Sequence, residues 1–107
     1  MALAPGTPQR LLDLIAIQEG SIVSRQLLKR SSGNVTLFAF DKDQELSEHT
    51  TPHDALIMVL QGRATVTVAG DGREVGTGEV TFLPGGVPHA VRAPEPFVMA
   101  LVMLKAE

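Results

Sequence analysis

The chain has 107 residues and a formal net charge of -3, and its composition is 44% hydrophobic and 20% charged. That length suits one small domain, and the ordinary balance of residues excludes a disordered or fibrous chain. The acidic balance lacks the basic surface that binds phosphate backbones, so we expect no nucleic-acid partner. The absence of cysteine excludes disulfides, iron–sulfur clusters and thiol nucleophiles.

The N-terminal segment and the apolar runs argue against export or membrane insertion. Residues 1–10 contain prolines and do not resemble a secretory signal. The longest apolar runs, residues 55–60 and 97–104, are far shorter than the roughly 20 residues that span a bilayer. We therefore predict a cytoplasmic protein with no membrane partner.

The first predicted elements are a helical turn and two strands. Thr7 is typical of an N-cap and Pro8 of a first helical position, so we expect a short, apolar-faced helix or turn within residues 9–17. Residues 21–28 and 34–40 are rich in β-branched or aromatic side chains, which predicts two strands with a polar turn between them.

The middle of the chain predicts a bend followed by a hairpin. Pro52 lacks an amide donor and favours an extended residue before it, so we expect a bend between strands at 45–50 and 55–62. Residues 64–75 alternate small or apolar side chains with threonines. The Asp-Gly pair at residues 71–72 predicts that this hairpin turns there.

The last predicted strands lie at residues 79–83, 89–91 and 97–104. Many short strands joined by Gly- and Pro-containing turns predict an all-β sandwich or closed barrel. The strands at 55–60 and 97–104 are apolar on both faces, although a strand that faces water on one side should alternate. Either the N-terminal segment or a second subunit must cover the outer face, and we predict a homodimer.

The segment from Gly78 to His89 follows the pattern G-x(5)-P-x-G-x(2)-H. Gly78 permits a tight turn into a strand, and Pro84 stiffens the exit from that strand. Gly86 allows a positive φ, so that His89 enters the next strand aimed at a fixed side. This pattern resembles the second conserved motif of the cupin superfamily.

The stretch that includes His49 to Gly62 is similar to the first cupin motif, G-x(5)-H-x-H-x(3,4)-E-x(6)-G. The spacing from His49 to Gly62 fits this motif. The chain departs from the family pattern at four positions: Asp43 replaces a glycine, Thr51 the second histidine, Ala55 the glutamate, and Ala93 a terminal asparagine.

The resemblance implies an all-β fold, the double-stranded β-helix or jelly-roll barrel of RmlC-like cupins, with a short N-terminal helix or turn. Residues 1–107 are then expected to form a single cupin domain. Its motif-bearing barrel would cover about residues 37–104, and residues 1–36 would form an N-terminal extension.

The resemblance also implies a metal site. In the family, two histidines and the glutamate of the first motif bind a divalent metal with the histidine of the second, and only His49 and His89 remain here. A Zn, Mn, Fe or Ni ion on these two residues is one expectation, and a pocket without a cofactor is the other. His53 is the candidate third ligand. An extended strand would place it about 13 Å from residue 49, so it joins the site only if the chain bends at Pro52.

Two functions stay open at this stage. In the first, the barrel binds a small, mostly apolar molecule oriented by His49, His89 and Thr51, and Ala55 enlarges the pocket and removes a charge. In the second, the chain is a metal-dependent enzyme, dioxygenase- or isomerase-like, with His49 and His89 as ligands. The absence of tyrosine excludes the tyrosine acid of the sugar-epimerase branch. A small molecule is the expected partner in both cases.

Overall fold

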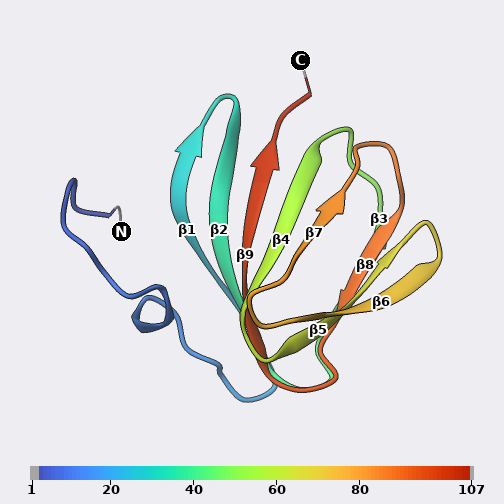
Figure 1. Ribbon diagram of the computed structural model, residues 1–107, viewed down its shortest axis with the longest axis horizontal. Helices are drawn as coiled ribbons and strands as arrows, with labels where there is room; N and C mark the ends of the chain where they lie inside the picture. The colour runs from blue at the N-terminus through green and yellow to red at the C-terminus, as the bar shows by residue number, and fades with distance from the viewer. Residues whose placement is uncertain (1–2, 107) are drawn as a thin grey trace.

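Nine β-strands in two antiparallel sheets form the fold in the computed structural model, which describes residues 3–106 (Figure 1). The strands are β1 (Ile22–Arg30), β2 (Gly33–Phe40), β3 (Glu45–His49), β4 (Asp54–Gln61), β5 (Arg63–Val68), β6 (Asp71–Gly76), β7 (Val80–Leu83), β8 (His89–Arg92) and β9 (Phe97–Leu104). One sheet has the order β1-β2-β9-β4-β7 and the other the order β3-β8-β5-β6. This arrangement confirms the predicted all-β jelly roll.

The hydrophobic core lies between the two sheets, because alternate side chains of each strand point inward. Ile57 and Val59 on β4 and Phe97 and Met99 on β9 are at most 1% exposed. The ring of Phe97 stacks on that of Phe40 from β2, with centroids 4.6 Å apart. Burial of each such side chain stabilises the fold by roughly 1.5–3 kcal/mol. The core therefore fixes which face of every strand points into the barrel.

The predicted N-terminal helix or turn is a single 3₁₀ turn at Leu11–Asp13. Arg10 occupies the N-cap position, so the expectation of Thr7 as N-cap is wrong. Leu11 and Leu12 are 42% and 44% exposed. With no buried apolar face, a longer helix has no tertiary packing to stabilise it. Among residues 3–106, no helix is long and apolar enough to cross a membrane.

The hairpin of β5 and β6 turns at Ala69 and Gly70, and not at residues 71–72 as the Asp-Gly pair predicted. Both turn residues have positive φ angles, 52° and 80°, as the two-residue turn of a twisted hairpin requires. This register places Ala64 opposite Val75, and both are buried in the core. Core packing therefore determines the position of the turn.

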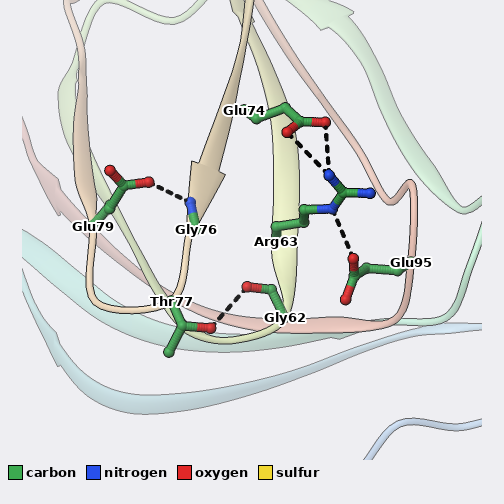
Figure 2. Close-up of polar contacts among 7 residues, drawn as sticks. All are labelled: Gly62, Arg63, Glu74, Gly76, Thr77, Glu79 and Glu95. Atoms are coloured by element: carbon green, nitrogen blue, oxygen red, sulfur yellow. Dashed lines mark hydrogen bonds and ion pairs between the residues drawn. The ribbon is translucent and has the colours of Figure 1, made fainter.

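Polar contacts join four segments at the start of β5 (Figure 2). Arg63 lies 3.1 Å from Glu74 on β6 and 2.7 Å from Glu95 in the loop before β9. The Thr77 hydroxyl donates to the Gly62 carbonyl at 2.8 Å. Gly62 has a φ of 75°, and a Cβ there would lie 2.4 Å from a backbone oxygen. These contacts join the β5–β6 hairpin to the loops on both sides of it.

The N-terminal segment covers part of the outer face of the five-stranded sheet. Arg25 on β1 donates to the Leu14 carbonyl at 2.9 Å, and Leu60 on β4 lines a hollow together with residues 10–13. Because β2 and β9 lie between β1 and β4, the segment crosses these two strands. It runs along one side of the fanned strands before entering β1 (Figure 1). The outer-face side chains that are buried are Leu37, Ala39, Val98 and Ala100.

Candidate functional site

The structure brings His49 and His89 together from neighbouring strands. His49 ends β3 and His89 begins β8, and a register shift after Leu46 places them opposite each other. Their Nε2 atoms are 3.0 Å apart, and their rings meet edge to face at 70° with centroids 4.2 Å apart. His89 is 8% exposed, and His49 is exposed. The pair therefore lies at the boundary between the barrel interior and the solvent.

The loop before His89 is fixed against the loop after His49. Gly86 has the expected positive φ, 79°, and its amide donates to the Thr51 carbonyl at 2.7 Å. A Cβ on Gly85 would lie 2.4 Å from the Pro52 carbonyl oxygen. The two loops thus pack backbone against backbone, and the glycines of the second motif make this approach possible.

Each imidazole is oriented by a carbonyl two residues before it. Nδ1 of His49 lies 2.9 Å from the Ser47 oxygen, and Nδ1 of His89 lies 3.3 Å from the Val87 oxygen. A carbonyl only accepts, so each Nδ1 is matched when it carries the hydrogen. A neutral imidazole has one N–H, so both Nε2 atoms then present lone pairs to each other. Two neutral rings carry two N–H hydrogens in total. The two carbonyl contacts and the contact between the Nε2 atoms would together need three.

Burial keeps His89 neutral. Desolvation, followed by the nearby charge of His49, lowers the pKa of His89 below its ordinary value of 6.5, and the bond to the Val87 carbonyl opposes this effect. A neutral His89 cannot provide the missing third hydrogen near pH 7. A donor group or a cation from outside the chain is therefore the natural complement of the two Nε2 atoms.

The structure places His53 away from this pair. The chain bends at residues 52–53 as predicted, but Nδ1 of His53 accepts a hydrogen bond from the Ala106 amide at 3.1 Å. Its imidazole is therefore directed toward the C-terminal segment. The Thr51 hydroxyl contacts the backbone of His53, with both N and O at 3.3 Å. The bend thus turns the His53 ring toward Ala106, and the Thr51 hydroxyl makes its hydrogen bonds with the backbone of His53.

As metal ligands, His49 and His89 fit two adjacent coordination positions. Two nitrogens bound at about 2.1 Å and at about 90° to each other lie about 3 Å apart, and the Nε2 atoms have that separation. Their Nδ1–H groups point to carbonyls, as is usual for ligating histidines. Within residues 3–106, however, no group of three or more His, Cys, Asp or Glu side chains could hold a metal ion. Ala55, on β4, packs against the core without offering a ligand atom.

An inner row of side chains connects the histidine pair to the open edge of the barrel. His89 is the Cα partner of both His49 and Val68, and Val68 is the partner of Asp71. Paired residues share a face of the sheet. Val68 also lines a hollow of about 270 Å³ that extends to Thr81. The pair and the hollow are therefore neighbours along one surface.

Two charged residues at this hollow were not predicted from the sequence. Asp71 and Arg73 both line it, and Arg73 Nε lies 2.9 Å from Asp71 Oδ2. Asp71 was assigned to a turn, which concealed that it alternates with Arg73 and the buried Val75 on one face of β6. A hairpin placed two residues earlier would have indicated this alternation.

The chain matches a known protein family. Residues 36–104 match the Cupin domain family. An uncharacterized protein from Streptomyces coelicolor is 33% identical over 64 residues, which cover 60% of this chain and 61% of that protein. The matched region thus spans about three fifths of that relative's length.

Solved structures agree over nearly the whole chain. A conserved protein of unknown function from Streptococcus pyogenes has a TM-score of 0.92 and 33% identity, covering 98% of this chain and 92% of its own. A cupin superfamily protein from Desulfitobacterium hafniense has a TM-score of 0.91 and 26% identity, covering 97% and 95%. The family match covers well over half of the chain, and the jelly roll and the glycine-rich loop before His89 agree with it. The chain therefore belongs to the cupin family.

Proposed function

We propose that this cupin binds a small organic molecule at the mouth of the barrel, with its polar end at His49 and His89. One observation carries the proposal: the two Nε2 atoms face each other at 3.0 Å while both Nδ1 atoms contact carbonyls. This arrangement leaves a contact that a donor from a ligand would satisfy. Leaving it unmet in a half-buried site is costly.

The surroundings indicate the chemistry of the ligand. Beside the pair, Val68 and then Val66 and Val75 provide an apolar floor along the hollow. Ligand sites commonly combine such apolar walls with a few polar groups that fix orientation. The proposed ligand therefore has an N–H or O–H group for the histidines and an apolar body that lies over Val68.

A divalent metal on His49 and His89 is the second candidate, favoured by the Nε2 separation of 3.0 Å. Water or the organic molecule would complete the coordination shell, because two imidazoles fill only part of it. Such an ion would supply Lewis-acid chemistry, and the enzymatic alternative, dioxygenase- or isomerase-like, depends on it. In this case the chain's own contribution is to hold the two rings in a fixed orientation through the Ser47 and Val87 carbonyls.

The test uses full-length protein purified without a histidine tag. Elemental analysis measures Zn, Mn, Fe and Ni, and native mass spectrometry detects a retained organic molecule. The variants are His49→Ala and His89→Ala, and His53→Ala is the matched control because its ring contacts Ala106 instead of the pair. We expect both pair variants to lose the bound species and the control to keep it.

The outcomes separate the two candidates. An organic molecule on metal-free protein supports the binding pocket, whereas near-stoichiometric metal that is lost in both pair variants supports the metal site. Purified protein that holds neither is titrated with Zn²⁺, Mn²⁺, Fe²⁺ and Ni²⁺, and with organic molecules that combine a donor group and an apolar body. If the pair variants keep the bound species as the parent does, or if no titrant binds, the proposal is overturned.

A further inference from the structure

Two opposite charges stand at the edge of the hollow that begins beside the histidine pair. Asp71 and Arg73 line this hollow of about 270 Å³, and both come from β6, the edge strand of the four-stranded sheet (Figure 1). Asp71 is the Cα partner of Val68, and Arg73 is the partner of the buried Val66. Both charged side chains therefore lie on the inner face of the sheet, which is the face that a ligand would contact.

The contact between these two residues uses only part of each charged group. Arg73 Nε donates to Asp71 Oδ2 at 2.9 Å, and within residues 3–106 this is the one hydrogen bond that either side chain makes. A guanidinium has five donors and a carboxylate has two oxygens, so both Nη groups of Arg73 and Oδ1 of Asp71 remain for a ligand. The two side chains are 79% and 63% exposed, and an ion pair in such a position contributes little to the stability of the fold.

An apolar surface separates the two charges from the histidines. His89, Val68 and Asp71 are successive Cα partners on β8, β5 and β6, which places Asp71 two strand spacings, about 10 Å, from His89. Val68 lies between them, and Val66 and Val75 continue the apolar floor. A small molecule that follows this row has a donor group at the histidines, an apolar body over Val68 and a charged end at β6.

We propose that this molecule is an α-amino acid with a hydrogen-bond donor on an apolar side chain, and that Arg73 and Asp71 bind its zwitterion. The carboxylate accepts two parallel hydrogen bonds from the Nη groups of Arg73, and the ammonium donates to Oδ1 of Asp71. A simple anion would lie beside Asp71, and a simple cation would lie beside Arg73. Because such like-charge contacts are costly, two adjacent opposite charges in the protein favour two adjacent opposite charges in the ligand.

This inference deepens the proposed function and rests on it for the position of the donor end. Isothermal titration calorimetry on the full-length protein tests it with L-tyrosine and L-tryptophan, whose side chains offer an O–H and an N–H donor. Tyramine and tryptamine lack the carboxylate, and 3-(4-hydroxyphenyl)propionate and 3-(indol-3-yl)propionate lack the ammonium. We expect at least one of the two amino acids to bind. Its two analogues should bind tenfold or more weakly, because each loses charge-assisted hydrogen bonds.

Substitutions in the ion pair test the same contacts from the side of the protein. Arg73→Gln and Asp71→Asn should each weaken binding of the amino acid by about tenfold or more. Arg73→Lys keeps the charge without the parallel hydrogen bonds, so its loss should be smaller than that of Arg73→Gln. Arg92→Gln is the matched control, because Arg92 is an exposed arginine of the same sheet whose Cα partner, Thr65, lies on the opposite face. This control should bind as the parent does, and circular dichroism checks that every variant is folded.

Three results would overturn the inference: a parent protein that binds neither amino acid, analogues that bind as tightly as the amino acid, or an Arg73→Gln or Asp71→Asn protein that binds it as the parent does. His89→Ala separates this inference from the proposed function. If His89→Ala keeps the affinity of the parent while Arg73→Gln loses it, the zwitterion site stands and the histidine site fails. If His89→Ala loses its ligand while Arg73→Gln and Asp71→Asn bind normally, the histidine site stands and the zwitterion site fails.

Discussion

His49 and His89 point their Nε2 atoms at each other across 3.0 Å, and each ring is held by the carbonyl two positions before it in the chain. The orientation of each ring is therefore local to its own strand entrance. Removing one ring leaves the contact that orients the other. The site can accordingly be dissected by single substitutions without rebuilding it.

Replacing His89 with alanine should abolish binding at the site with a modest loss of stability. His89 contributes hydrogen bonds at the edge of the barrel and is not a member of the apolar core. A net loss of about 1 kcal/mol is expected, which is about 4–8 °C in the melting temperature of a domain this size. Thermal melts followed by circular dichroism measure it. A fall of tens of degrees would show that the histidine is a structural element of the fold.

Acid stability should depend in part on Asp41. Its carboxylate accepts from the Gly20 amide at 2.7 Å and the Lys42 amide at 2.9 Å, and these bonds lower its pKa below the ordinary value of 3.8. Because the folded state then binds fewer protons than the unfolded state, the carboxylate stabilises the fold above pH 3.8. This contribution disappears as the pH falls through the lower folded pKa.

The measurement compares the parent with Asp41→Asn by urea unfolding between about pH 7 and pH 2.5. The parent should be more stable at neutral pH, and the difference should shrink below pH 3.8. A difference that stays constant over this range would mean that the bonds to Gly20 and Lys42 do not depend on the charge. Asp13→Asn is a suitable control, because Asp13 lies in the exposed 3₁₀ turn.

Gly85→Ala should damage the site and the fold together. The added Cβ would lie 2.4 Å from the Pro52 oxygen and 2.9 Å from the carbon of that carbonyl, so the backbone itself must move. Forcing atoms into a packed region typically costs 1–3 kcal/mol, and the movement would separate the loops that position His49 and His89. Urea unfolding and the binding assay measure the two effects. In Gly72→Ala the new Cβ meets only the Thr67 hydroxyl at 3.3 Å, and this variant should keep both properties.

Phe97→Ala should be the most destabilising of these changes. Phe97 is completely buried and stacks on Phe40 at 4.6 Å, and truncating such a ring costs about 3–5 kcal/mol. That is a large part of the total stability of a small domain. Chemical denaturation should show a much lower midpoint with an unchanged slope. A loss below 1 kcal/mol would indicate that the core collapses around the missing ring.

Alternating and apolar runs of residues predicted most strands, because a strand that packs one face against the core buries every second side chain. The glycine and proline positions before His89 also predicted how this residue enters β8, since they specify backbone geometry directly. The turn at Ala69 could not be predicted in this way. Its position follows from pairing Ala64 with Val75, a contact between strands, whereas the Asp-Gly signal is local.

The relation between His49 and His89 was predictable from the two motifs, but their ring orientation was not. It depends on the Ser47 and Val87 carbonyls and on a register shift in β3. The direction of His53 was equally hidden, because it depends on the amide of Ala106, more than 50 residues later. A contact between residues so far apart in the sequence forms only when the strands assemble into sheets.

The Arg63 contacts with Glu74 and Glu95 have a practical consequence. Arg63 begins β5, and Val68, the partner of His89, ends it, so the two are about 17 Å apart along the strand. Loops at the histidine end can therefore be varied in a mutant library while the Arg63 ion pairs still hold the loops at the opposite end together. This small cupin is thereby suited to engineering, as a scaffold in which new specificities are selected at one rim.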